Sequence, residues 1–315
     1  MTETEAPTQT EAPPAQRLVI DESHGGVEWH VELDRALLLP GTLVAGRLRL
    51  QARDAVEARA LVLGLEGQEH WRHRVTRTDA DGHVTTEVVR STAEPIREPV
   101  RLEDGVTLAP GEVLERPFEV PVPPLGPASL DAEDAGMAWT FEAKLDIEGG
   151  LDSRVERPVT VAQPIGLLRA GAVHLGEFAL YDRVDVAAGG VTGAIQLRPV
   201  PLVCGEPFSG RLELHVPGRL RLQEIRAELR IRVEATVSEG EHQEVTAWAA
   251  TVAPGGDLSG DAGFDVSGLL PSVALPSSEL PHGRANATFH VILAVAWSPD
   301  THLQRDVAIA TTSEV

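Results

Sequence analysis

The chain has 315 residues and a formal net charge of −21, with 42 % hydrophobic and 24 % charged residues, which is an ordinary globular balance. Such an acidic surface repels phosphate backbones and anionic lipid headgroups, so it argues against a basic patch that binds nucleic acid or a membrane. The length suits two domains of common size, each with its own hydrophobic core.

Residues 1–16 read MTETEAPTQTEAPPAQ and show no apolar periodicity. Because this composition cannot bury enough apolar area to offset the entropy of ordering, we expect a disordered acidic tail that folding does not need. No apolar run is long enough to cross a membrane, no basic-then-apolar leader opens the chain, and Cys204 is the only cysteine. These features predict a reducing compartment and a cytoplasmic location.

Residues 17–163 are predicted to form strands, because apolar residues recur at every second position instead of with a helical period. Leu48 and Leu50 are one example, and the strand from Met137 to Ile147 is another. A hairpin is expected over residues 75–89 with Asp81-Gly82 at its turn. The prolines and glycine of residues 110–124 argue against a helix there.

Residues 171–315 repeat these landmarks in the same order. The phrase GTLVAGRLRL begins at Gly41, and GEPFSGRLEL, which has the same glycines and the same Arg-Leu-x-Leu, begins at Gly205. A second hairpin turn is expected at Glu239-Gly240, and Ala253-Pro254-Gly255 matches Ala109-Pro110-Gly111. A repeat this long indicates duplication of whole domains, not a solenoid.

The fold class predicted from these patterns is all-β, with two tandem immunoglobulin-like sandwich domains. The first would cover residues 17–163 and the second residues 171–315. The strand pattern is broken by Pro and Gly over residues 162–171, where we place the linker.

Several segments resemble those of the arrestin superfamily. They are PGTLVAGRLRL from Pro40, LVLGLEGQEHW over 61–71, FEVPVPPLGPASL over 118–130 and MAWTFEAKLDI over 137–147, with counterparts in the second half. The resemblance implies two arrestin-like sandwiches that bind other proteins. It departs from the receptor-desensitising arrestins, because the helix of their first domain and their long regulatory C-terminal tail have no counterpart here.

The alpha-arrestin Pro-Pro-x-Tyr signal is also missing, because Tyr181, the only tyrosine, is not preceded by that pattern. What remains is similar to the simpler core of the retromer arrestin-like subunit and of the bacterial sporulation-control family. The predominance of arginine over lysine indicates GC-rich codons and suits a bacterial source.

No motif predicts catalysis, a cofactor or a metal. Lys144, the only lysine, fits neither a phosphate-binding loop nor a Ser-x-x-Lys nucleophile. Cys204 is expected to serve packing or a turn, and the HWRH segment at 70–73 is expected to be an exposed strand end whose two imidazoles face opposite ways. The carboxylate pairs at 131–134 and 239–241 follow from composition. Trp139 and Trp297 are expected inside core strands, which argues against a sugar-binding platform.

The segment SGLLPSVALPSSELP over 267–281 is apolar and spaced by prolines. Four of its side chains are candidate partner-binding residues: Leu269, Leu270, Val273 and Leu275. The alternative is that they are buried against the protein's own sandwich or at the domain junction. The predicted function is that of a non-enzymatic adaptor or scaffold for protein partners; a structural component of a larger bacterial assembly and an enzyme with an unfamiliar carboxylate site remain alternatives. The sequence names neither the partner, nor the pathway, nor the oligomeric state.

Overall fold

The computed structural model describes residues 17–124 and 126–313, so the predicted acidic tail lies outside the described residues. Strands make up most of the described chain, and α1 (Ile165–Arg169) is the only helix in that part. No helix within the described ranges has the length and apolar character needed to span a lipid bilayer. The predicted all-β class is confirmed.

We call the strands of residues 18–161 the N-terminal sheets. They are β1 (Leu18–His24), β2 (Val27–Leu33), β3 (Leu37–Leu38), β4 (Leu43–Ala52), β5 (Val56–Thr78), β6 (Val84–Thr92), β7 (Ile96–Leu108), β8 (Val113–Pro121), β9 (Ala135–Ile147) and β10 (Ser153–Val161). One sheet has the order β1-β2-β4-β8, and the other has the order β3-β10-β9-β5-β6 with β7 also on β5.

The two N-terminal sheets pack face to face, as alternation of buried and exposed side chains requires. The pattern along β2 is strictly alternating, and Trp29, Val31 and Leu33 are buried on its inner face. Phe118 of one sheet stacks on Phe141 of the other, with ring centroids 5.8 Å apart. This contact joins the two layers into a sandwich.

We call the strands of residues 183–310 the C-terminal sheets. They are β11 (Arg183–Ala188), β12 (Val191–Arg198), β13 (Leu202–Val203), β14 (Pro207–Ala235), β15 (His242–Leu269), β16 (Ser278–Leu280), β17 (Gly283–Val295), β18 (Thr301–Val307) and β19 (Ile309–Ala310). β14 pairs with β15 along almost its whole length, while its first part also pairs with β12 and its second part with β17. Phe208, Trp248 and Phe289 form a chain of ring contacts in the core between them.

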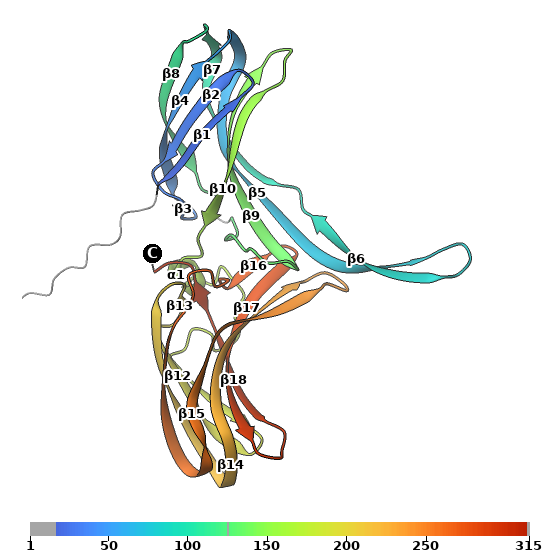
Figure 1. Ribbon diagram of the computed structural model, residues 1–315, viewed down its shortest axis with the longest axis vertical. Coiled ribbons are helices and arrows are strands. Elements are labelled where there is room, and N and C mark those ends of the chain that lie inside the picture. Colours follow the sequence, from blue (N-terminus) through green and yellow to red (C-terminus); the bar gives the residue numbers. More distant parts are fainter. Residues whose placement is uncertain (1–16, 125, 314–315) are drawn as a thin grey trace, which may run out of the picture.

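Strand ladders stay within one set of sheets or the other, apart from isolated bridges at His73↔Gly240 and Pro164↔Thr312. Figure 1 shows the N-terminal sheets at one end of the long axis and the C-terminal sheets at the other. Residues 162–182, which include the predicted linker, contain α1 and no strand, and Leu168 of α1 packs with Val173 and Ala179.

The repeated phrase occupies equivalent positions in the two sets of sheets. Gly41 and Gly205 both have φ +77°, a conformation that glycine adopts without steric cost. The Gly41 amide donates to the Val122 carbonyl, and the Gly205 amide donates to the Leu270 carbonyl in the same way. The short strand before each glycine also has an equivalent partner. β3 pairs in parallel with β10, and β13 pairs in parallel with β19.

One landmark of the repeat is placed wrongly by the sequence. Residues 109–111 form the turn between β7 and β8, where the chain passes from one sheet to the other. In the C-terminal sheets β14 changes partner between His215 and Leu222, opposite Gly260, whereas Ala253 and Pro254 lie inside β15. The shared Ala-Pro-Gly letters therefore do not mark equivalent structure.

Candidate functional site

The apolar segment at 269–275 divides into buried and exposed side chains. Leu270 has no exposed surface, and Leu275 packs against the core. Leu269 is 61 % exposed and Val273 is 86 % exposed. Leu270 is also fixed by its backbone, because its amide donates to the Glu206 carbonyl. The four side chains that the sequence grouped as one candidate surface therefore do not face solvent together.

Cys204 lies beneath this segment. Its thiol donates to the Ala274 carbonyl at 3.2 Å, and burial raises its pKa to about 11. Because a thiolate is the nucleophilic form, this thiol is poorly suited to covalent catalysis at neutral pH. The position agrees with the packing role expected from the sequence.

The HWRH segment is not an exposed strand end, as the sequence indicated, but the place where the two sets of sheets meet. Trp71 stacks on His282, in the turn between β16 and β17, with ring centroids 4.0 Å apart. Buried Glu69 accepts hydrogen bonds from the His282 amide at 2.7 Å and is 3.0 Å from its Nδ1. His70 contacts the Ala132 carbonyl through Nε2. These partners lie far away in the sequence, so alternation along one strand does not reveal them.

The carboxylate pairs noted in the sequence belong to the same junction. Arg72 forms ion pairs with Glu133 and Asp134, and Arg74 forms one with Glu241 at 2.5 Å. Burial raises the pKa of Asp134 even though the Arg72 guanidinium lies close to it. Carboxylates engaged in this way hold strands together and are not arranged as an acid and base around a cleft.

Beyond this junction β5 and β6 leave the body as a two-stranded ribbon, residues 72–92, which we call the arm. Figure 1 shows the arm projecting away from both sets of sheets, with β6 as one of its two strands. The Arg72 amide donates to the Asp134 carbonyl, and the Arg74 amide donates to the Glu239 carbonyl. Backbone bonds from both sets of sheets therefore hold the base of the arm on its β5 side.

The β6 side of the arm is different. β6 pairs with β5 from Thr92 to Val84 without a register shift, and no other strand of the described chain pairs with it. Backbone bonds join Ala93 to Glu69 and Asp79 to His83 at the two ends of this ladder. Hydrogen-bonded pairs alternate in an antiparallel ladder, so the bonds at Ala93 and His83 mean that every second residue between them, including Glu87, bonds to β5. The N–H and C=O groups of the remaining residues face outward, and these residues are Val84, Thr86, Val88 and Arg90.

The free edge of β6 carries few of the devices that protect an edge strand, and Glu87 and Arg90 are the only charged residues of this strand. Its sequence VTTEVVRST contains no Pro, Gly or Lys, and Val84 and Val88 are 64 % and 46 % exposed. By comparison, neighbouring β7 carries Pro99 and Gly105, and β15 contains Pro254 and three register shifts against β14. A regular, exposed edge rich in Val and Thr is a template for another strand.

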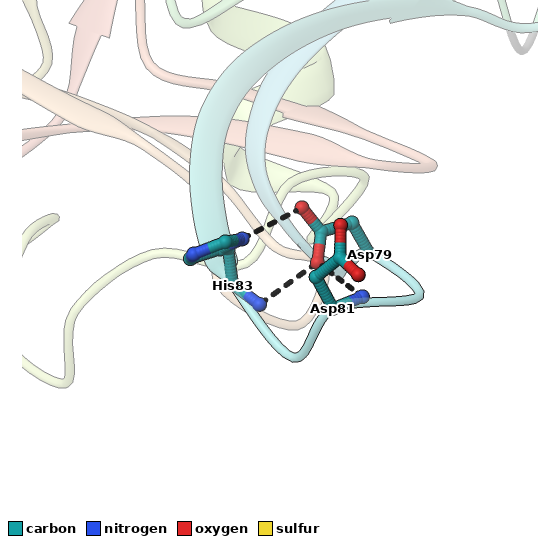
Figure 2. A group of neighbouring side chains, drawn as sticks. All are labelled: Asp79, Asp81 and His83. Atoms are coloured by element: carbon teal, nitrogen blue, oxygen red, sulfur yellow. Dashed lines mark hydrogen bonds and ion pairs between the residues drawn. The ribbon is translucent and has the colours of Figure 1, made fainter.

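The tip of the arm gathers Asp79, Asp81 and His83, whose possible metal-ligand atoms lie within 4.8 Å of one another. Figure 2 shows how the Asp79 carboxylate is used: it accepts from the His83 amide at 2.8 Å and the Asp81 amide at 3.0 Å, and it lies 3.2 Å from His83 Nδ1. The amide of His83 is the main cause of the lowered pKa of Asp79. The cluster thus stabilises the predicted Asp81-Gly82 turn.

A shallow hollow of about 810 Å³ lies on the outer face of β11, β12, β14 and β15. Its basic groups are matched by neighbouring acids: Arg183 with Glu213 at 2.7 Å, and His215 with Asp261 at 2.6 Å. These side chains are about half exposed or more, where ion pairs contribute little free energy. The hollow is a charged surface between strands and not an enclosed catalytic cleft.

Trp297 is not in a core strand, which corrects the expectation from the sequence. Trp139 is buried as expected, but Trp297 follows the end of β17 with φ +64° and is fully exposed. The apolar alternation of β17 ends at Val295, so Trp297 lies in the turn after the strand and not on its buried face.

Comparison with known proteins adds no assignment: no protein-family model matches the chain, and no curated protein matches it.

Proposed function

We propose that this protein is a non-enzymatic adaptor that binds a partner protein by adding one of the partner's extended segments to the free edge of β6. The observation that carries this proposal is the row of outward backbone groups from Val84 to Arg90, on an arm anchored at its base and exposed beyond it. Main-chain hydrogen bonds supply affinity in this mode of recognition, and alternate side chains supply specificity.

The arm suits this task because it already forms an extended ribbon in the absence of a partner. Thr76 and Thr86 place their hydroxyl oxygens 3.1 Å apart across the ribbon, Arg77 forms an ion pair with Glu87 at 3.2 Å, and Asp79 closes the turn. An edge that is already extended reduces the ordering entropy that binding must overcome. The resemblance of the repeated segments to arrestin-like adaptors supports the same proposal.

The test compares Thr86→Pro with Thr86→Ala in quantitative capture of proteins from a native lysate. Both changes remove the Thr76–Thr86 contact, but only proline removes the outward N–H. Proline is tolerated on an edge strand where its nitrogen faces solvent, so the ladder to β5 should persist, which circular dichroism and melting can check. We expect alanine to retain the captured partner and proline to lose it.

Equal capture by the two variants would contradict the proposal. Recovery of a multi-copy complex whose assembly ignores both changes would instead favour the structural-component alternative.

A further inference from the structure

Arg90 is one of the two charged residues of β6, and its backbone faces the free edge. Arg77 engages Glu87, which is the other charged residue of β6, whereas Arg90 makes no ion pair with any described residue. The residue directly opposite Arg90 on β5 is Arg72, in a pair that is not hydrogen-bonded, where facing side chains are closest. Arg72 has Glu133 and Asp134 as partners, whereas the residue that faces Arg90 across the ribbon carries a like charge.

The outward residues of β6 also share one face of the arm. Val84, Thr86, Val88 and Arg90 are separated by two positions each, so their side chains point the same way. A strand that pairs with this edge places its own alternate side chains opposite them. An acid opposite Arg90 would neutralise its charge, and apolar residues opposite Val88 and Val84 would cover their exposed surface.

We propose that the partner segment is an extended strand in which an Asp or Glu is followed by apolar residues two and six positions later, bound antiparallel to β6. This inference rests on the proposed function, because it assigns the partner's chemistry to the same edge. The antiparallel direction sets the order of the partner's residues. Its acid faces Arg90, its residue two positions later faces Val88, and its residue six positions later faces Val84.

A second copy of this chain that pairs through its own β6 edge does not fit that description. In antiparallel self-pairing, outward residues can only face outward residues, so Arg90 would meet Val84, Thr86, Val88 or another Arg90. Glu87 cannot face Arg90 in this arrangement, because its backbone groups are directed toward β5.

The test uses a displayed library of random nine-residue peptides selected on the full-length protein, with Thr86→Pro protein as the counter-selection. We expect enriched peptides to carry the acid and the apolar residues at these spacings. Peptides with the order of the motif reversed serve as matched controls of equal composition. Arg90→Glu should weaken binding of the acidic peptides about fivefold and restore affinity for versions with Lys in place of the acid, because the change turns an opposite-charge cross-strand pair into a like-charge pair.

The outcomes separate the two proposals. Peptides that need the Thr86 N–H but show no acid at this register, or that ignore Arg90→Glu, overturn the partner chemistry and leave the edge-binding function standing. Failure to recover any peptide that distinguishes Thr86→Pro from Thr86→Ala contradicts the edge-binding function itself. Dimerisation that is lost in Thr86→Pro would make a second copy the occupant and also overturn this inference.

Discussion

Leu270 and Leu269 are adjacent residues with opposite surroundings. Leu270 has no exposed surface and sits where the repeated turn of Gly205 closes, whereas Leu269 is 61 % exposed at the end of β15. Burial of Leu270 and exposure of Leu269 follow from the alternation of side chains at the end of β15. Composition alone cannot say which of two neighbouring leucines faces the core.

We therefore expect Leu270→Asp to destabilise the protein by about 3–5 kcal/mol, because it places an unpaired carboxylate in an apolar site. Leu269→Asp is the matched control and should leave the melting temperature almost unchanged. Thermal unfolding followed by circular dichroism measures both. If Leu270→Asp melts like the unmodified protein, the side chain is not part of the core.

Cys204 gives a second prediction at this scale. Burial raises its pKa to about 11 from an ordinary value of 9.0, so the folded state disfavours the thiolate. By linkage, the stability associated with the neutral thiol is fully present below about pH 9 and is lost as the pH rises through about 11. At mildly alkaline pH we expect alkylation by iodoacetamide to be roughly 100-fold slower in the native protein than in the denatured one. Equal rates, followed by mass spectrometry, would show that the thiol is accessible and ordinary.

At the scale of single elements, the hairpin of the arm is readily predicted from the sequence, but the free edge of its outer strand β6 is not. Alternating Thr and Val around Asp81-Gly82 predict the hairpin, because turn chemistry and strand period are local properties. Whether another strand covers β6 depends on residues distant in sequence, so no local pattern reveals its free edge. The same limit hides the contact of Trp71 with His282, and it explains why shared Ala-Pro-Gly letters do not mark an equivalent turn.

The turn of the arm should depend on Asp79 and not on Asp81. Asp79→Ala removes the acceptor of the His83 and Asp81 amides, and amide hydrogen exchange over residues 77–85 should become faster. Asp81→Ala, the control, should change exchange little. Since the pKa of Asp79 is lowered, the carboxylate's contribution is present above its unfolded pKa and is lost only as the pH falls through the lower folded value. Protection that arises only on adding a divalent cation would instead make the turn a metal site.

At the scale of the whole molecule, the junction fixes how the arm is carried. Residues from both sets of sheets bond to Arg72 and Arg74, and Gly283 lies so close to Ala135 that an added Cβ would sit 2.5 Å from the alanine Cβ. The close approach of the Ala135 side chain leaves no space for a side chain at position 283. The position of the arm is therefore a property of the packed junction and not of β5 and β6 alone.

Gly283→Ala should separate the two sets of sheets at the junction, because the added methyl group has no space. Gly218→Ala is the control, because open space surrounds the added atom there. The expected result is faster exchange of the Arg74 and Glu241 amides, which bond across the junction, while the cores of the sheets stay protected. Unchanged exchange at both amides would show that the junction tolerates the extra methyl group and is looser than its contacts indicate.

The central claim, that β6 offers its free edge to a partner strand, is tested most directly by residue-resolved amide exchange with and without a library-selected peptide. In the free protein the amides of Val84, Thr86, Val88 and Arg90 should exchange fast, and those between them should be protected by β5. Adding the peptide should protect the fast set and leave the alternate set as it was. Protection that falls elsewhere, or that does not follow this alternation, would contradict strand addition at β6.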